Sequence, residues 1–191
     1  MHYCIHIFTK ELPSEDKIRE IIQPYNDDSV YFDEDGHKKE ELTEAPPFMW
    51  DYFVIGGRYH GALKLVMRDN DEEYQWEYYS RTPREGRLFH STLLKEIRES
   101  FVSYKAREED WLGYMSDSTF LFVDGAKIKD IINLDDVGCY GYATDEGEAY
   151  SREQWDPSNH EFINHDDFDE KHQQMLEKYK DGFLTRIDVH D

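Results

Sequence analysis

The chain has 191 residues, of which 43 are acidic and 22 basic, so its formal net charge is −21 at pH 7. Hydrophobic residues make up 38% and aromatic residues 15%, which favours a core of few, large side chains over general disorder. This negative charge repels phosphate backbones and anionic lipids, which argues against direct binding to nucleic acid or a membrane. It favours a basic protein partner, or a metal ion held among carboxylates. The alternative is that the acidity only keeps the protein soluble.

The length fits a single domain over residues 1–191. The first six residues lack the charged and apolar regions of a signal peptide, and no run approaches the roughly 20 apolar residues of a membrane span. Two cysteines, Cys4 and Cys139, are too few for a disulfide scaffold and are expected to be reduced. We therefore expect a cytoplasmic location.

The N-terminal part of the chain is predicted to form a strand and then a helix. Residues 2–8 alternate in a way that is typical of a strand. Ser14 is the expected N-cap of the helix, which should end by Gln23 because Pro24 disfavours a helical residue before it. The apolar stripe of this helix is Ile18, Ile21, Ile22 and Tyr25.

A polar surface excursion is expected over residues 26–47. It contains a predicted turn at residues 33–36 and a short edge strand at residues 30–32. Its last residues, 45–47, form a stiff approach to an aromatic, glycine-containing segment at residues 50–61.

The middle of the chain is predicted to hold two strands and a second helix. The strands, at residues 63–67 and 74–79, flank an acidic tip at residues 69–73. Ser91 is the expected N-cap of the helix. Its apolar stripe is Leu94, Ile97, Phe101 and Tyr104.

The C-terminal part is predicted to start with a hairpin, which joins residues 119–123 to residues 126–132 through a tight turn at Asp124 and Gly125. A strand or bulged turn that contains glycines is expected at residues 137–143, followed by an acidic loop. A third helix is marked by Phe168 and Tyr179 and is expected to end at Gly182 in a left-handed conformation. Residues 183–189 are predicted to form the last strand. Together the elements predict an α+β fold, with a mostly antiparallel sheet and about three helices packed on it.

The segment at residues 50–61 is the first candidate site. Trp50 and Tyr59 could line a site for a flat ligand, and Arg58 could bind a carboxylate or phosphate. The two glycines would let the backbone come close to the ligand. Alternatively, Asp51 pairs with Arg58, the glycines form a bulge and the aromatic side chains fill the core. The expected ligand-binding residues are Trp50, Asp51, Gly56, Gly57, Arg58 and Tyr59.

The second candidate site lies on one face of the first predicted strand. His2, Cys4 and His6 share that face and could supply imidazole and thiolate to zinc. If the first and last strands pair, four side chains could converge on a metal or acid/base site. They are His2, His6, Asp188 and His190. The alternative is a set of exposed or singly hydrogen-bonded residues, and no metal ion or other cofactor is expected.

Other chemical motifs are weak. Residues 164–172 are rich in oxygen and nitrogen donors but lack the offsets of a calcium loop and the pattern of a zinc helix, so an acidic helix start explains them. The sequence contains no nucleophile motif, phosphate-binding loop or pair of Cys-x-x-Cys motifs. These absences lower the expectation of an enzyme.

Several short motifs carry a resemblance to a group of proteins. They are Trp50-Asp51-x-Phe53-x-x-Gly56-Gly57-Arg58-Tyr59, Asp124-Gly125, Gly138-x-Tyr140-Gly141 and Leu184-Thr185-x-x-Asp188-x-His190. In these motifs the chain resembles uncharacterised bacterial and phage-borne proteins with a W-D-x-aromatic-x-x-G-G-R-aromatic segment and an Asp-x-His ending. The resemblance implies no activity, and it favours an origin in a mobile element.

Two functions are consistent with these features. The first is a non-enzymatic acidic binding protein of phage origin that binds and inhibits a basic or nucleic-acid-processing host defence protein. Its expected partner-binding residues are Asp33, Glu34, Asp35, Asp69, Asp71, Glu72 and Glu73. The second is a nucleotide or small-molecule binding or hydrolysing protein, with its site in the Trp50 to Tyr59 segment and His and Asp residues as partners.

Overall fold

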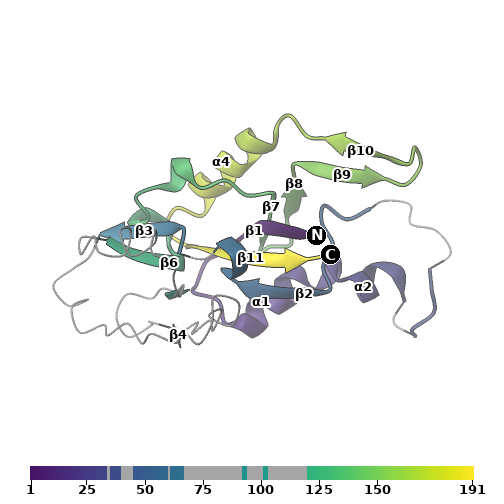
Figure 1. The fold of residues 1–191 in the computed structure, drawn as a ribbon, viewed down its shortest axis with the longest axis horizontal. Helices are drawn as coiled ribbons and strands as arrows, with labels where there is room; N and C mark the ends of the chain where they lie inside the picture. Colours follow the sequence, from purple (N-terminus) through teal and green to yellow (C-terminus); the bar gives the residue numbers. More distant parts are fainter. Residues whose placement is uncertain (34, 40–44, 60, 67–91, 94–100, 103–119) are drawn as a thin grey trace.

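The structure is a computed structural model that describes residues 1–33, 35–39, 45–59, 61–66, 92–93, 101–102 and 120–191 (Figure 1). Within these ranges the fold is α+β, with a mixed, mostly antiparallel sheet and three α-helices. The predicted fold class is confirmed in that form. None of the helices in these ranges is long and apolar enough to cross a membrane.

The main sheet is centred on β1 (His2–Thr9) and β11 (Phe183–His190), which pair antiparallel along their full length. The predicted first and last strands are thus confirmed, and they are neighbours. The other edge of β11 pairs with β6 (Phe120–Lys127) near its start and with β2 (Tyr52–Ile55) near its end. The other edge of β1 pairs with β7 (Gly141–Thr144), and this is the parallel pairing in the sheet.

Shorter strands extend the sheet on both sides. β3 and β5 pair with β6, β4 pairs with β5, and β8 pairs with β7. β9 and β10 form a separate two-stranded sheet that projects beyond the start of α4 (Figure 1). The bounds are β3 (Leu63–Val66), β4 (Thr92–Leu93), β5 (Phe101–Val102), β8 (Ala149–Ser151), β9 (Glu153–Asp156) and β10 (Glu161–Asn164).

The first and third predicted helices are confirmed. α1 (Glu15–Ile22) begins after Ser14, whose Oγ accepts a hydrogen bond from the Lys17 N–H at 3.1 Å, and its C-cap is Gln23. α4 (Phe168–Lys178) lies where the spacing of apolar residues predicts a helix. The remaining helical elements are η1 (Gln23–Tyr25), α2 (Asp27–Tyr31), η2 (Gly57–Tyr59), η5 (Ile128–Asp130) and η6 (Leu134–Asp136).

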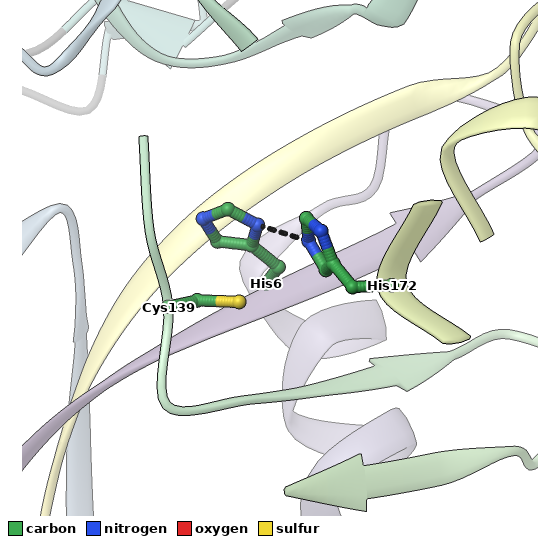
Figure 2. Close-up of side chains that lie close together, drawn as sticks. All are labelled: His6, Cys139 and His172. Atoms are coloured by element: carbon green, nitrogen blue, oxygen red, sulfur yellow. Dashed lines mark hydrogen bonds between the residues drawn. The ribbon is translucent and has the colours of Figure 1, made fainter. Parts of the chain in front are cut away.

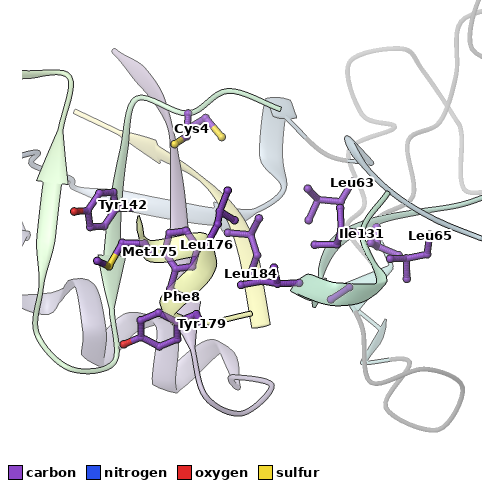
Figure 3. Close-up of a cluster of buried hydrophobic side chains, with 14 of the residues drawn as sticks. Cys4, Phe8, Leu63, Leu65, Ile131, Tyr142, Met175, Leu176, Tyr179 and Leu184 are labelled. Atoms are coloured by element: carbon purple, nitrogen blue, oxygen red, sulfur yellow. The ribbon is translucent and has the colours of Figure 1, made fainter. Parts of the chain in front are cut away.

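The two faces of the sheet bury different clusters because side chains alternate along β1. Ile5 and Ile7 lie in a cluster with Ile18 and Ile22 of α1. Phe8, from the other face, lies in a cluster with side chains of α4 and β11. Figure 3 shows members of this second cluster, which include Phe8, Met175, Leu176, Tyr179 and Leu184. The sheet therefore has α1 on one face and α4 on the other (Figure 1).

Two predictions in the N-terminal and middle parts are wrong. Residues 30–32 do not form an edge strand, because Asn26 caps α2 by accepting a hydrogen bond from the Asp28 N–H at 3.2 Å. Residues 92–93 and 101–102 are strands, so the predicted second helix is wrong at these positions. Its remaining residues, and the strand predicted at residues 74–79, lie outside the described ranges.

Three predictions in the C-terminal part are also wrong. β6 continues through Asp124 and Gly125, because Gly125 pairs with Thr185 of β11 instead of forming a turn. The predicted acidic loop contains β8, β9 and β10. Gly182 is not left-handed; a side chain there would overlap the carbonyl oxygen of Thr9, so close packing explains this glycine.

Candidate functional site

Two histidines lie side by side at one end of the central strands. His2 is directly opposite His190, and their ring centroids are 4.9 Å apart in an edge-to-face arrangement. Nδ1 of His2 lies 2.9 Å from Oδ1 of Asp188, and Nδ1 of His190 lies 2.9 Å from Oδ1 of Asp51. Because an ionised carboxylate only accepts, each Nδ1–H donates. The result is two adjacent histidine–carboxylate pairs, which we call the paired-histidine site.

The strand register brings these residues together. Residues two apart on a strand share a face, so Asp188 and His190 point the same way as their partner His2. Tyr52 of β2 pairs with His190 from the other side, and the two rings stack with centroids 4.9 Å apart. The Asp51 N–H donates to the His190 carbonyl at 2.9 Å, which fixes Asp51 beside the ring.

The Gly-Gly-Arg sequence packs around the carboxylate of Asp188. The Arg58 N–H donates to Oδ2 of Asp188 at 2.9 Å, while Oδ1 accepts from His2. Gly57 has φ +50°, and a Cβ there would overlap the Asp188 side chain. Gly56 has φ +72°, and a Cβ there would overlap the buried Asp124. The two glycines are therefore required for close approach to two buried aspartates.

Tyr59 and Arg186 support the end of the strand that carries His2. The Tyr59 hydroxyl donates to the His2 carbonyl at 3.1 Å, and Nη1 of Arg186 donates to the Tyr59 carbonyl at 3.2 Å. Nη2 of Arg186 donates to Sγ of Cys4 at 3.1 Å. Burial raises the pKa of Tyr59, so its hydroxyl remains a proton donor to the backbone. These contacts hold the strand end that carries His2.

The paired-histidine site opens to solvent on the His190 side. The His190 and Asp51 side chains are 34% and 49% exposed, against 17% for His2 and 6% for Asp188. Burial acts to raise the pKa of Asp51, but hydrogen bonds from His190 and from the Tyr52 N–H outweigh it, so the pKa is lowered. Asp51 is thus held as the anion that pairs with His190.

The geometry suits acid–base chemistry. A carboxylate on Nδ1 fixes the tautomer in which Nε2 carries the lone pair. Within the part of the chain that the structure describes, Nε2 of His2 and Nε2 of His190 have no hydrogen-bond partner. Of two neighbouring rings of this kind, a neutral one can take a proton at Nε2 and a protonated one can give a proton from Nε2.

The expected ligand-binding residues divide into two groups. Asp51, Gly57, Arg58 and Tyr59 reach the paired-histidine site. Trp50 does not: it is 2% exposed, and its indole N–H donates to a backbone carbonyl of α1 at 2.7 Å. Gly56 contacts Asp124 as described above. The alternative pairing of Asp51 with Arg58 is replaced by the pairing of Asp51 with His190.

The expected partner-binding acids are only partly described. Asp33 is exposed and organises a turn, because its Oδ1 accepts from the N–H groups of Asp35 and His37 at 3.0 and 2.8 Å. Glu34 and residues 69–73 lie outside the described ranges.

The predicted convergence of histidines occurs in part. His2, Asp188 and His190 come together, whereas His6 pairs in register with Arg186 and contacts His172 of α4. Sequence reasoning missed Tyr52 as a stacking partner of His190. The run of aromatic and β-branched residues from Tyr52 to Ile55 indicates a strand, but not the strand with which it pairs.

A pocket of about 310 Å³ lies between residues 45–49 and the β9–β10 sheet. Its walls are largely aromatic and proline side chains, with the acids Glu153 and Asp191 at its lining. The walls include Tyr3, Pro46, Phe48, Tyr140, Trp155 and Phe162. Tyr3 and His2 are adjacent in β1 and point to opposite faces, so this pocket is distinct from the paired-histidine site.

A scan of the chain against protein-family models found no match, and neither did searches of curated proteins and of solved structures.

Proposed function

We propose that the protein binds a nucleotide or a related phosphorylated small molecule at the paired-histidine site and hydrolyses its phosphate ester. The observation that carries the proposal is the placement of His2 and His190 side by side, each with Nδ1 held by a carboxylate and Nε2 without a partner in the described residues. Paired acid and base groups of this kind contribute about 10²- to 10⁴-fold to proton-transfer reactions.

In the proposed reaction, Nε2 of one neutral imidazole takes a proton from water as the water oxygen attacks phosphorus. The neighbouring imidazolium gives its proton to the ester oxygen that leaves. One P–O bond forms and one breaks, and the two rings exchange protonation states. Proton exchange with solvent then restores the starting pair.

Two residues beside the histidines fit the recognition of such a substrate. Arg58 has an exposed side chain on a backbone fixed by Asp188, and its guanidinium can bind a phosphate through two hydrogen bonds. Tyr52 is 47% exposed and extends the row of rings beyond His190, which suits stacking with a nucleobase. The guanidinium supplies a local positive charge on a strongly acidic protein.

The experiment is a thermal-shift screen against nucleotides and phosphate esters, followed by a phosphate-release assay on each compound that raises the melting temperature. We expect His2→Asn and His190→Asn each to lower kcat by about 100-fold or more. Arg58→Ala should mainly raise KM. His160→Asn is the matched control, because His160 is exposed and has φ +55°, which asparagine tolerates. The proposal is overturned if His2→Asn and His190→Asn lose no more activity than His160→Asn, or if none of the compounds binds.

A second candidate function is favoured by the 310 Å³ pocket. We propose that this pocket binds an apolar segment with basic residues from a host protein, such as a defence or nucleic-acid-processing factor, with the protein acting as a phage-borne inhibitor. The support is the aromatic lining, which includes the exposed Trp155 and Phe162, together with Glu153 and Asp191 and a net charge of −21. We place this role in the reducing cytoplasm, which suits the free cysteines.

The second function has its own test. Co-purification from host extract with wild type and with Phe162→Ala should identify a basic partner that the variant loses. Binding should weaken as salt rises, because complementary charges are screened. His190→Asn should bind that partner normally, which separates this function from the catalytic one. A partner bound equally at high salt and by Phe162→Ala would contradict it.

A further inference from the structure

Three buried donor side chains meet on the face of β1 that α4 covers. They are His6 of β1, Cys139 of the segment before β7, and His172 of α4 (Figure 2). One ligand atom from each lies within 4.8 Å of the others. The three residues are 1%, 7% and 8% exposed, so they form a closed cluster and not a chance grouping on the surface.

The donor set matches a particular class of ion. Two imidazole nitrogens and one thiolate are ligands that zinc and neighbouring d-block cations bind, whereas calcium and magnesium require oxygen ligands. Around tetrahedral zinc, with Zn–N distances near 2.05 Å and Zn–S near 2.3 Å, donor nitrogens are about 3.4 Å apart and a nitrogen and sulfur about 3.6 Å. Nδ1 of His6 and Nε2 of His172 are 2.9 Å apart, so binding would require them to separate by about half an ångström.

The protonation state of the two rings fits a ligand role. Burial lowers the pKa of His172 to about 4, with a further contribution from the charge of Arg152, and burial also lowers the pKa of His6. Both rings are therefore neutral at pH 7 and carry a lone pair. One proton lies between the two facing nitrogens. When a cation binds there, this proton moves to the other nitrogen of its ring. The Cys139 thiol, whose pKa burial raises, releases its proton to solvent on binding the ion.

One atom of the cluster lacks a protein partner. Nε2 of His6 is buried and makes no hydrogen bond in the described residues. It is the nitrogen of the ring that does not face His172, so it can hold the proton of the ring once Nδ1 binds a cation.

We propose that His6, Cys139 and His172 bind one d-block cation, with Zn²⁺ as the best fit, and that this ion fastens α4 and the segment before β7 to the central strand. The sequence pattern pointed to zinc ligands on this strand but grouped His6 with His2 and Cys4. The three residues come from separate elements, so no spacing in the sequence marks them. The site is separate from the paired-histidine site and does not depend on the proposed function.

The test uses the full chain freed of metal by a chelator and titrated with Zn²⁺ by calorimetry, with the melting temperature followed in parallel. We expect one Zn²⁺ per chain and a rise in melting temperature. Cys139→Ser and His172→Gln should weaken binding by more than about 100-fold, since changes even to residues that only support ligands cost about 10- to 100-fold. Cys4→Ser is the matched control, because Cys4 is equally buried but lies outside the donor group. His190→Asn should also bind normally.

A spectroscopic measurement on the wild type covers the case in which a ligand variant fails to fold. Co²⁺ in place of Zn²⁺ should give a thiolate-to-cobalt charge-transfer band at one equivalent, and this band should persist in Cys4→Ser. The proposal is overturned if the chain binds no stoichiometric ion or if the cobalt complex lacks the thiolate band. It is also overturned if Cys4→Ser and Cys139→Ser lose affinity for the ion equally.

Discussion

Gly57 packs against Asp188 so closely that a single added carbon would overlap the aspartate side chain. This contact lets the backbone N–H of Arg58 reach one oxygen of the carboxylate while His2 contacts the other. Gly57 thus supports the geometry of the paired-histidine site, although it contributes no side chain to it.

Gly57→Ala tests this contact directly. We expect a loss of about 2–4 kcal/mol in the free energy of unfolding, because overpacking adds to the strain of a left-handed backbone. Gly147→Ala is the control: Gly147 has φ +86° but nothing within 4 Å, so only the strain of about 1–2 kcal/mol remains. Urea denaturation of both variants measures the difference, and equal losses would contradict the packing argument.

Trp50→Phe should affect stability and not ligand binding. Trp50 is buried, packs edge-on against Phe53 and donates to the Ile22 carbonyl, so the smaller ring leaves a cavity and an unsatisfied acceptor. We expect a loss of about 2–4 kcal/mol in the free energy of unfolding. Trp155→Phe, at an exposed position, should change it by less than about 0.5 kcal/mol. A variant at position 50 that kept its stability and lost a ligand would instead assign Trp50 to a binding site.

Asp51→Ala should change the tautomer of one histidine and leave the other unchanged. Asp51 accepts from Nδ1 of His190, whereas Nδ1 of His2 donates to Asp188. Without its acceptor, His190 should populate the form protonated at Nε2. Nitrogen NMR shifts of the two rings measure this. A change of equal size at His2 would show that the two pairs are not independent.

The ion pairs of Glu146 predict a specific pH dependence. Hydrogen bonds from Lys10 and Lys178, together with their charges, lower the pKa of Glu146 from 4.5 to about 2. Because the pKa is lower in the folded protein, these pairs stabilise the fold above about pH 4.5, and the contribution is lost as the pH falls towards 2. Carboxyl NMR titration should show a midpoint near 2.

A neighbouring lysine provides the control for this measurement. Lys178→Met should raise the Glu146 midpoint, because it removes a direct partner. Lys180→Met should leave the midpoint unchanged, because Lys180 pairs with Glu177 at 2.7 Å. An unchanged midpoint in Lys178→Met would contradict the proposed cause of the shift.

The elements that sequence patterns predicted well are those whose signals are local. β1 alternates along most of its length and β11 alternates from Arg186 to His190. Ser14 caps α1 through its own side chain, and α4 has apolar residues at helical spacing. Such signals depend on the chain within a few residues and need no knowledge of the tertiary structure.

The errors occurred where a distant partner overrides the local signal. Asp124 and Gly125 form a good turn pair, yet they continue β6 because β11 and the glycine at position 56 surround them. Phe101 has helical spacing with its neighbours in sequence but pairs as a strand with β6. Local propensity is a weak guide when burial and pairing favour another conformation.

The candidate site could be predicted from the sequence only on the condition that the first and last strands pair. Alternation places His2 on one face of its strand and Asp188 with His190 on one face of theirs, but their convergence requires that these strands pair. Asp51 was an expected site residue, but its pairing with His190 could not be foreseen, because it depends on β2 lying along the other edge of β11. Pairing partners are set by the whole sheet and not by any one segment.

The pairing of β1 with β11 also has a kinetic consequence. His2 and Asp188 are separated by 186 positions in the sequence, so their contact closes a very long loop. Contacts at such separations cost chain entropy before they contribute stability, and folds that depend on them assemble slowly. The paired-histidine site should therefore form late in refolding, and the recovery of its NMR signals should report the completion of the fold.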